Sequence, residues 1–163
     1  MLTSPPSTAT PFDRKLTYQA AFQQLLQLGQ REIIVCERDF SESDLNSKAC
    51  SQILWAFFTQ ASPGQLKILV HDADFLATNC PRLLQLRDQF AHCIEMRVMA
   101  EADSGWDKAF AIADQQHFWQ RFYFKSYRGE SGCDSASVAL LQHDFALLWQ
   151  QASASNAWQR LYL

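Results

Sequence analysis

Apolar residues recur at helical spacing in several segments of the chain, which we predict to be amphipathic helices. The predicted helices cover residues 14 to 28, 44 to 62, 79 to 90 and 135 to 151. The first has Asp13 as its expected N-cap and Gly29 as its stop. The last has its apolar positions at Val138, Leu141, Phe145, Leu148 and Trp149. These spacings predict helices that each bury one side.

Short β-branched or apolar runs alternate with the first of these helices. They cover residues 31 to 36, 66 to 71 and 93 to 99, and we predict them to be buried strands. A strand, a helix and a following strand favour parallel pairing through a right-handed crossover. The first hundred residues therefore predict a βαβαβ unit with helices packed on the sheet.

The second half of the chain changes character. Two further apolar runs, residues 109 to 114 and 118 to 124, are separated by only three residues, which predicts a β-hairpin. Turn residues then precede the last helix. The fold class predicted is α/β, with a mixed sheet, a βαβαβ start, a β-hairpin, a C-terminal helix and helices on both faces.

The two ends of the chain have different compositions. Residues 1 to 12 hold three of the five prolines among Ser and Thr, so we predict a disordered leader whose deletion leaves stability nearly unchanged. Residues 13 to 163 are predicted to form a single α/β domain, and residues 158 to 163 a tail that can pack back onto it.

Composition and charge narrow the classes of function. Of 163 residues, 48% are hydrophobic and 19% charged, as in a packed globular protein. The net charge of -3 without a basic block argues against bulk nucleic-acid binding. Five scattered cysteines without a C-x-x-C pair indicate neither a disulfide framework nor a zinc site. We expect a cytoplasmic protein without a signal peptide or a membrane span.

Polar side chains follow the second predicted strand directly. They are His71, Asp72 and Asp74, at the end of a strand where α/β proteins usually bind ligands, so they are candidates for a metal or polar ligand. In the alternative, an aspartate caps the following turn and His71 only ends the strand. The loops after Cys36 and His71 contain no glycine, so we expect no nucleotide phosphate loop and no bound cofactor.

Four arginines are candidates for anion binding, because guanidinium groups bind phosphate and carboxylate through two parallel hydrogen bonds. They are Arg82, Arg97, Arg121 and Arg128. If several of them face one cleft, that cleft would hold a small anion or a phosphate-containing ligand. The alternative is ion pairing with nearby carboxylates, namely Asp72, Asp74, Glu95, Asp107 and Asp114.

The predicted hairpin reads F-A-I-A-D at residues 110 to 114, followed by Q-Q-H-F-W, and the last helix carries D-F-A-L-L-W at residues 144 to 149. In the order of its elements and in these motifs, the chain from residue 31 to residue 153 resembles one half-domain of the phospholipase D superfamily. In that superfamily a strand carries H-x-K-x-x-x-x-D, a second strand follows closely, and a helix ends in a phrase like F-x-x-L-W. The resemblance implies a phospholipase D-like fold with a cleft for phosphate.

The catalytic residues of that superfamily do not match. With Asp114 on the motif aspartate, the histidine position is Asp107 and the lysine position is Ala109. A shift that uses Lys108 puts Trp106 on the histidine. The superfamily's chemistry needs an imidazole that attacks phosphorus and another that protonates the leaving group. The resemblance therefore implies a degenerate, non-catalytic relative that does not hydrolyse phosphodiesters.

Three hypotheses about function follow. The first is a binding or scaffolding module with an anion-binding cleft, in which Arg121, seven residues after Asp114 across the hairpin, takes over the role of the missing lysine. The second is a metal-dependent or phosphoester-acting enzyme that uses Asp72, Asp74 and Asp114 with His71 or Arg121. The third is a structural subunit that docks onto a partner protein through an aromatic surface that includes Trp106, Trp119, Trp149 and Trp158. The module of the first hypothesis could also be a homodimer.

Overall fold

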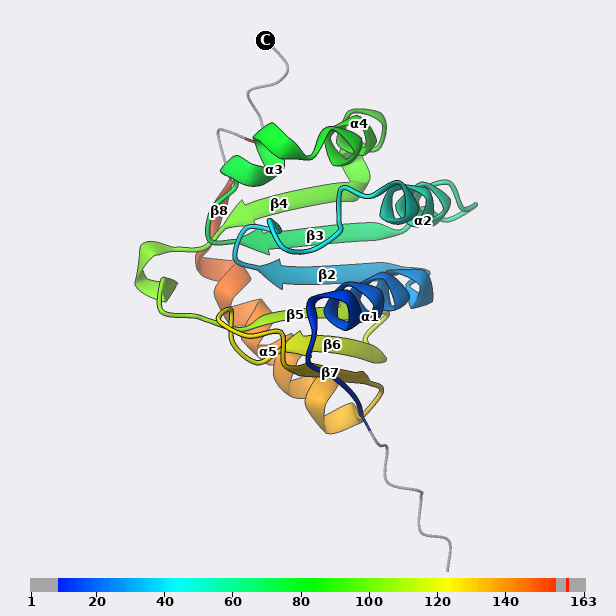
Figure 1. Ribbon diagram of the computed structural model, residues 1–163. Coiled ribbons are helices and arrows are strands. Elements are labelled where there is room, and N and C mark those ends of the chain that lie inside the picture. Colours follow the sequence, from blue (N-terminus) through cyan, green and yellow to red (C-terminus); the bar gives the residue numbers. More distant parts are fainter. Residues whose placement is uncertain (1–8, 155–157, 159–163) are drawn as a thin grey trace, which may run out of the picture.

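Eight strands form one mixed sheet in the computed structural model, which describes residues 9–154 and residue 158 (Figure 1). The strands are β1 (Thr10–Phe12), β2 (Glu32–Glu37), β3 (Gln65–Val70), β4 (Ile94–Val98), β5 (Ala109–Ala113), β6 (His117–Arg121), β7 (Gly129–Gly132) and β8 (Ser153–Ala154). Their order in the sheet is β1-β7-β6-β5-β2-β3-β4-β8. Strands β2, β3 and β4 run parallel, and the remaining neighbours pair antiparallel. The predicted mixed α/β sheet is confirmed.

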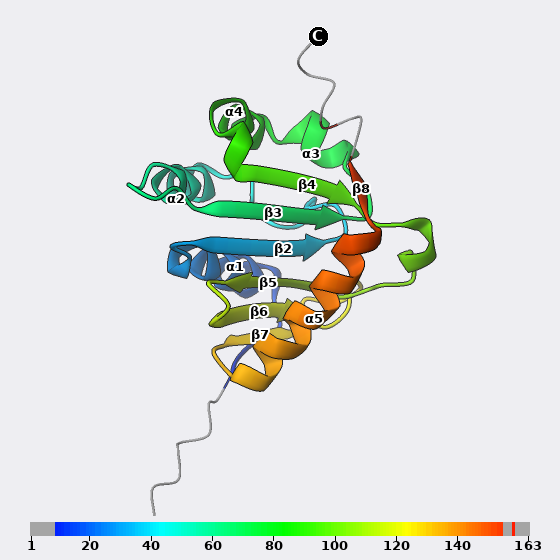
Figure 2. The same ribbon diagram turned by 180° about the vertical axis from the view of Figure 1, so that it is seen from behind.

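Helices lie on both faces of this sheet. They are α1 (Lys15–Leu28), α2 (Lys48–Phe58), α3 (Asp74–Asn79), α4 (Pro81–Gln89) and α5 (Ser135–Gln151). Figures 1 and 2, which view the molecule from opposite sides, show α1, α2 and α4 on one face and α5 running across the other. The predicted helices on both faces are therefore confirmed, and the bounds of α5 agree with the predicted ones.

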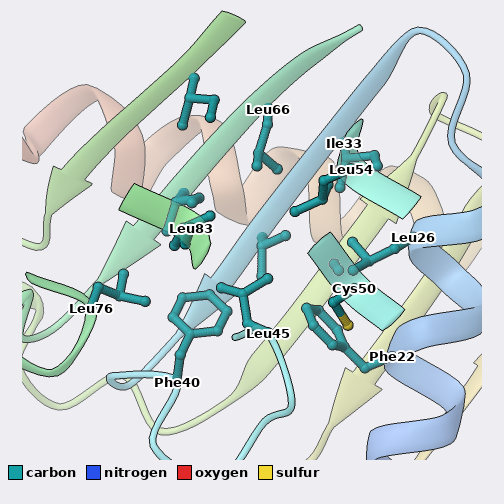
Figure 3. Close-up of a cluster of buried hydrophobic side chains, with 14 of the residues drawn as sticks. Phe22, Leu26, Ile33, Phe40, Leu45, Cys50, Leu54, Leu66, Leu76 and Leu83 are labelled. Atoms are coloured by element: carbon teal, nitrogen blue, oxygen red, sulfur yellow. The ribbon is translucent and has the colours of Figure 1, made fainter. Parts of the chain in front are cut away.

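The protein has a hydrophobic core on each face of the sheet, and successive side chains of β2 pack alternately into the two cores. Ile33 and Val35 point toward the helices α1 and α2, in the cluster shown in Figure 3, whereas Ile34 and Cys36 point toward α5. The α5 side contributes Val138, Leu141, Phe145 and Leu148. A strand that is covered on both faces needs a continuous apolar run, and residues 33 to 36 of β2 form one.

The prediction that residues 1 to 12 lie outside the fold was wrong for its last residues. Thr10–Phe12 form β1, which pairs antiparallel with β7. Phe12 is buried, and its ring stacks on that of Trp119 at a centroid distance of 6.1 Å. Gly129 on β7 makes this possible, because a Cβ there would lie 2.5 Å from the Phe12 ring and 2.0 Å from the Gln120 carbonyl oxygen. Residues 1 to 8 lie outside the described residues.

Other local predictions also needed correction. Arg14 rather than Asp13 is the N-cap of α1. Helix α2 begins later than predicted, because Ser47 accepts a hydrogen bond from the Cys50 amide at 3.1 Å and so caps it there. Strand β7 and helix α3 fall where only turns were expected. Of the predicted tail, Trp158 is buried against Arg87, and residues 159 to 163 lie outside the described part.

Candidate anion-binding pocket

The loops that form the candidate site meet at the carboxyl end of β2. The antiparallel register pairs Cys36 with Phe110, Ala109 with Arg121, and Arg121 with Gly129. The carboxyl ends of β2 and β6 and the amino ends of β5 and β7 therefore lie at the same end of the sheet. The parallel strand β3 also ends here, just before His71.

Arg121 is buried at this end and is bound by other parts of the protein. Only 3% of the residue is exposed. Its Nε donates to the Ser126 carbonyl at 2.6 Å, and its Nη2 donates to the Phe124 carbonyl at 2.6 Å. The same Nη2 forms an ion pair with the Glu42 carboxylate at 2.7 Å. Arg121 is therefore a structural residue, and its partner is Glu42 rather than the predicted Asp107 or Asp114.

A buried carboxyl lies beside this arginine. The Tyr18 hydroxyl donates to Glu37 Oε2 at 2.8 Å, and the Arg38 amide donates to Glu37 Oε1 at 2.9 Å. Burial raises the pKa of Glu37, although these two hydrogen bonds and the Arg121 charge oppose the rise. The Arg121 guanidinium also lies over the rings of Tyr18 and Tyr127, at 5.0 and 4.9 Å from their centroids. The buried polar groups thus satisfy one another.

A pocket of about 630 Å³ opens next to this buried cluster. It is lined by Asp107, Lys108, Phe122, Tyr123, Ser126 and Arg128. Among the described residues, no hydrogen bond or ion pair involves the side chain of Lys108 or Arg128. Two cations against the single carboxylate of Asp107 make the lining positive. We call this the Lys108–Arg128 pocket.

The loop of residues 122 to 128, which forms one wall of the pocket, is held by hydrogen bonds. The Phe122 amide donates to the Arg128 carbonyl at 2.9 Å, which closes the loop at its base. The Phe124 amide donates to the Asp107 carbonyl at 2.9 Å, and Arg121 binds two carbonyls from inside. The wall is therefore preorganised, which lowers the entropic cost of binding a ligand.

A second hollow of about 410 Å³ adjoins the first. It shares Phe122 and Arg128 with the Lys108–Arg128 pocket and adds residues of β1 and β7, namely Pro11, Phe12, Asp13, Gly129 and Glu130. Because Asp13 and Glu130 are carboxylates, this hollow is less suited to an anion. Arg128 lines both the Lys108–Arg128 pocket and this second hollow.

His71 lies at the same end of the sheet but is shielded. Its ring packs edge-on against Phe124 at 5.6 Å, and its Nε2 is buried with no hydrogen-bond partner among the described residues. Burial lowers the pKa of His71, and the charge of Arg38 lowers it further. Burial and the neighbouring charge thus disfavour the protonated imidazole, and His71 is not among the residues that line the pocket.

The two aspartates after β3 act on the local backbone. Asp72 Oδ1 accepts a hydrogen bond from the Asp74 amide at 2.9 Å, and Asp74 is the first residue of α3. The alternative of a turn cap therefore holds for Asp72. Among the described residues, no three His, Cys, Asp or Glu side chains are grouped so as to hold a metal ion.

Two of the candidate arginines lie away from the pocket and bind other parts of the chain. Arg82 hydrogen-bonds Asn46 through its amide and its Nη1, at 3.1 and 3.2 Å. Arg97 pairs with Glu95 at 3.0 Å, donates to the Trp149 carbonyl at 3.0 Å, and stacks on the Trp149 ring. Arg97 thereby fixes the end of α5 to β4.

Asp114 lies at the opposite end of the strands, next to the amino end of β2. Its carboxylate accepts the backbone amides of Gln30, Arg31 and Glu32 at 2.9, 2.7 and 3.0 Å. Partial burial acts to raise the pKa of Asp114, but the three amide hydrogen bonds prevail and lower it. Asp114 thus holds the turn before β2, and it does not share a cleft with Arg121.

Of the eight predicted site residues, only Arg128 lines the pocket. Lys108 was considered in the sequence only for a motif position, and Phe122, Tyr123 and Ser126 were not singled out. The signal that could have found Lys108 is its place directly before an apolar strand, next to the hairpin that leads to Arg128. Which of the arginines would be free could not be read from sequence spacing.

The sequence from residue 14 to residue 161 matches the model of a domain family described as a domain of unknown function, DUF7931. This chain belongs to that family. No protein among the curated sequences matches it. Within the described residues, no helix has the length and apolar character needed to cross a membrane.

Solved structures show the fold to be phospholipase D-like. Nuc of Salmonella typhimurium, a phospholipase D family member, superposes with a TM-score of 0.59 and 11% identity over 93% of this chain and 99% of its own. NucT of Helicobacter pylori gives a TM-score of 0.60 and 8% identity over 91% and 99%. At these identities the similarity concerns the fold alone.

The archaeal chromatin protein TrmBL2, whose structure shows a mode of DNA binding, is also similar. It gives a TM-score of 0.65 and 16% identity over 94% of this chain. The chain spans 56% of the length of TrmBL2. The similarity is again one of fold.

Proposed function

We propose that this DUF7931 protein is a non-catalytic phospholipase D-like module that binds a small phosphate-containing anion in the Lys108–Arg128 pocket. The observation that carries the proposal is the presence of two cationic side chains, unpaired among the described residues, on one preorganised pocket. A cation without a protein partner gains most from an external anion, because binding need not first break an ion pair.

The side chains at the motif positions support a non-catalytic role. Asp107 and Trp106 occupy the histidine position in the two possible alignments, and neither can form a phosphohistidine. Trp106 is engaged in the structure, since its Nε1 donates to the Lys108 carbonyl at 2.7 Å. His71 is at the same end, but its shielded Nε2 is not placed to attack a phosphorus atom in the pocket.

The charge of the chain favours a small ligand over nucleic acid. TrmBL2 binds DNA, yet this chain carries a net charge of -3. Binding by bulk neutralisation of backbone phosphates needs many Lys and Arg contacts. The Lys108–Arg128 pocket provides two.

The proposal is tested by thermal unfolding in phosphate or sulfate, compared with chloride at equal ionic strength. A ligand at 100 times its Kd stabilises by about 2.7 kcal/mol, which corresponds to a melting temperature higher by roughly 5–10 °C for a chain of this size. We expect such a rise for the wild type, and its loss in Lys108→Ala and Arg128→Ala. The matched control is Arg31→Ala, which removes an exposed arginine at the other end of β2.

Two results would contradict the proposal. An equal effect of phosphate, sulfate and chloride would remove the anion site. Turnover of a generic phosphodiester, abolished by a single substitution in this chain, would show that the module is an enzyme.

A further inference from the structure

Two aromatic rings line the Lys108–Arg128 pocket beside its cations. Phe122 and Tyr123 are consecutive residues of the preorganised loop, and both belong to the pocket lining. Neither ring contacts another aromatic ring among the described residues. Tyr123 is 59% exposed, and its hydroxyl has no hydrogen-bond partner among them.

The neighbouring rings behave differently. Phe124, the next residue of the same loop, packs against His71, and Tyr127 packs against Tyr18 at 5.6 Å. Phe12 of β1 stacks on Trp119. The loop thus packs Phe124 and Tyr127 against other aromatic rings and leaves Phe122 and Tyr123 in the pocket lining.

The backbone at Tyr123 is fixed although its ring is free. The Tyr123 carbonyl accepts the Ser126 amide at 3.2 Å, and the flanking Phe122 and Phe124 amides are both hydrogen-bonded. An aromatic side chain has few rotatable bonds, so a ring on a fixed backbone loses little entropy when a ligand packs on it. The pocket volume of about 630 Å³ lies within the usual range for small-molecule sites.

We propose that the Lys108–Arg128 pocket selects phosphate esters that carry a planar ring, with Tyr123 as the stacking surface and Lys108 and Arg128 as the phosphate ligands. The inference rests on the proposed function and adds the class of ligand. A planar aromatic ring can stack with an offset on Tyr123, whereas a puckered saturated ring of the same size has no π system to stack. Stacking of a base on an aromatic side chain is worth about 1–3 kcal/mol.

The same chemistry is found in two sources, simple aryl phosphates and nucleoside monophosphates. The experiment therefore compares inorganic phosphate, cyclohexyl phosphate, phenyl phosphate and adenosine monophosphate by isothermal titration calorimetry at constant ionic strength. Phenyl and cyclohexyl phosphate match in charge and nearly in size and differ in planarity. We expect phenyl phosphate to bind at least about 5-fold more tightly than cyclohexyl phosphate.

The variants separate the ring from the charges. Tyr123→Ala should bind the phenyl and cyclohexyl esters equally, while Tyr123→Phe should keep the preference because it keeps the ring. Leu147→Ala, which truncates another exposed apolar residue on α5, should leave all affinities unchanged. Because Tyr123 is exposed, both of its variants should unfold at the wild-type denaturant concentration.

The outcomes distinguish this inference from the proposed function. A preference for adenosine monophosphate as well as phenyl phosphate would extend the ligand class to nucleotides, and a preference for phenyl phosphate alone would restrict it to aryl esters. Equal binding of all esters would overturn the inference and leave the anion site intact. Absence of binding by every probe would overturn both.

Discussion

Arg121 holds together residues from three separate parts of the chain. Its guanidinium binds Glu42, donates to two carbonyls of the loop 122 to 128, and lies over the rings of Tyr18 and Tyr127. A buried charge whose Nε and Nη2 are hydrogen-bonded contributes mainly by keeping its neighbours satisfied. At the residue scale it therefore acts on the pocket indirectly, through the shape of the loop.

We predict that Arg121→Ala lowers the free energy of unfolding by about 3–5 kcal/mol, since removal leaves two carbonyls and the buried Glu37 without their cation. Denaturant unfolding measures the loss. Glu42→Gln, which keeps an oxygen acceptor for the guanidinium at a partly exposed position, should cost much less. A fully stable Arg121→Ala protein that has lost its response to phosphate would instead assign the anion to Arg121.

Asp114 illustrates a residue whose role depends on its carboxylate and its backbone together. It accepts three amides and has a positive φ of 54°. Asn tolerates this left-handed conformation better than Ala does. We predict a loss of about 2–3 kcal/mol in the free energy of unfolding for Asp114→Ala, and a smaller loss for Asp114→Asn. Equal losses would mean that the backbone conformation is not a factor.

Strand β1 is the element whose role departs most from expectation. It is three residues long and includes Pro11, but Phe12 at its end is covered by Trp119, Tyr18 and Gly129. The antiparallel pairing with β7 then extends the sheet by one strand. A short edge strand with proline also limits pairing with other chains.

We predict that Phe12→Ala lowers the free energy of unfolding by about 3 kcal/mol, because a buried aromatic side chain is removed from a packed cluster. The control is Leu16→Ala on α1, where 79% of the residue is exposed and little change is expected. Chemical denaturation of the two variants provides the comparison. Wild-type stability in Phe12→Ala would restore the original expectation that the first twelve residues contribute nothing.

The stability of the whole molecule should depend on pH through Glu37. Its pKa is raised in the folded state, chiefly by burial, so between the unfolded and folded pKa values the folded chain holds more protons than the unfolded chain. Stability must then fall as the pH rises through this window. The hydrogen bonds from the Tyr18 hydroxyl and the Arg38 amide, and the charge of Arg121, lower the folded pKa of Glu37. Their effect is smaller than the rise that burial causes.

We predict that Glu37→Gln flattens this part of the pH profile, so that wild type and variant differ most above the folded pKa of Glu37. His71 has the opposite sign: its pKa is lowered by burial, and its contribution is lost as the pH falls below about 6.5. Subtracting the two profiles removes the His71 contribution, which both proteins share. A difference that is constant with pH would show that Glu37 does not titrate differently in the folded state.

The sequence by itself determined the order and type of most elements. Apolar periodicity sufficed for α1, β2, β3, β4, the β5–β6 hairpin and α5, because a covered strand or an amphipathic helix must show its buried face in the sequence. The phospholipase D-like fold was expected from the resemblance to that superfamily, and the solved structures confirm it. The sequence did not predict strands β1 and β7, because Pro11 and the two glycines of β7 do not produce an alternating apolar pattern. These strands form by pairing with each other and with β6.

Only the tertiary structure decided which charged residues are free. Arg121 and Arg128 are seven residues apart and chemically alike, yet one is buried against Glu42 and the other lines the pocket. Asp114 lies at the turn of the β5–β6 hairpin, whereas Arg121 is the last residue of β6. Because β6 runs antiparallel to β5, it carries the chain back along the sheet, so the two residues lie at opposite ends although they are close in sequence. Pairing of charges depends on distances between segments far apart in the chain, and those distances are set by the packed sheet and not by local sequence.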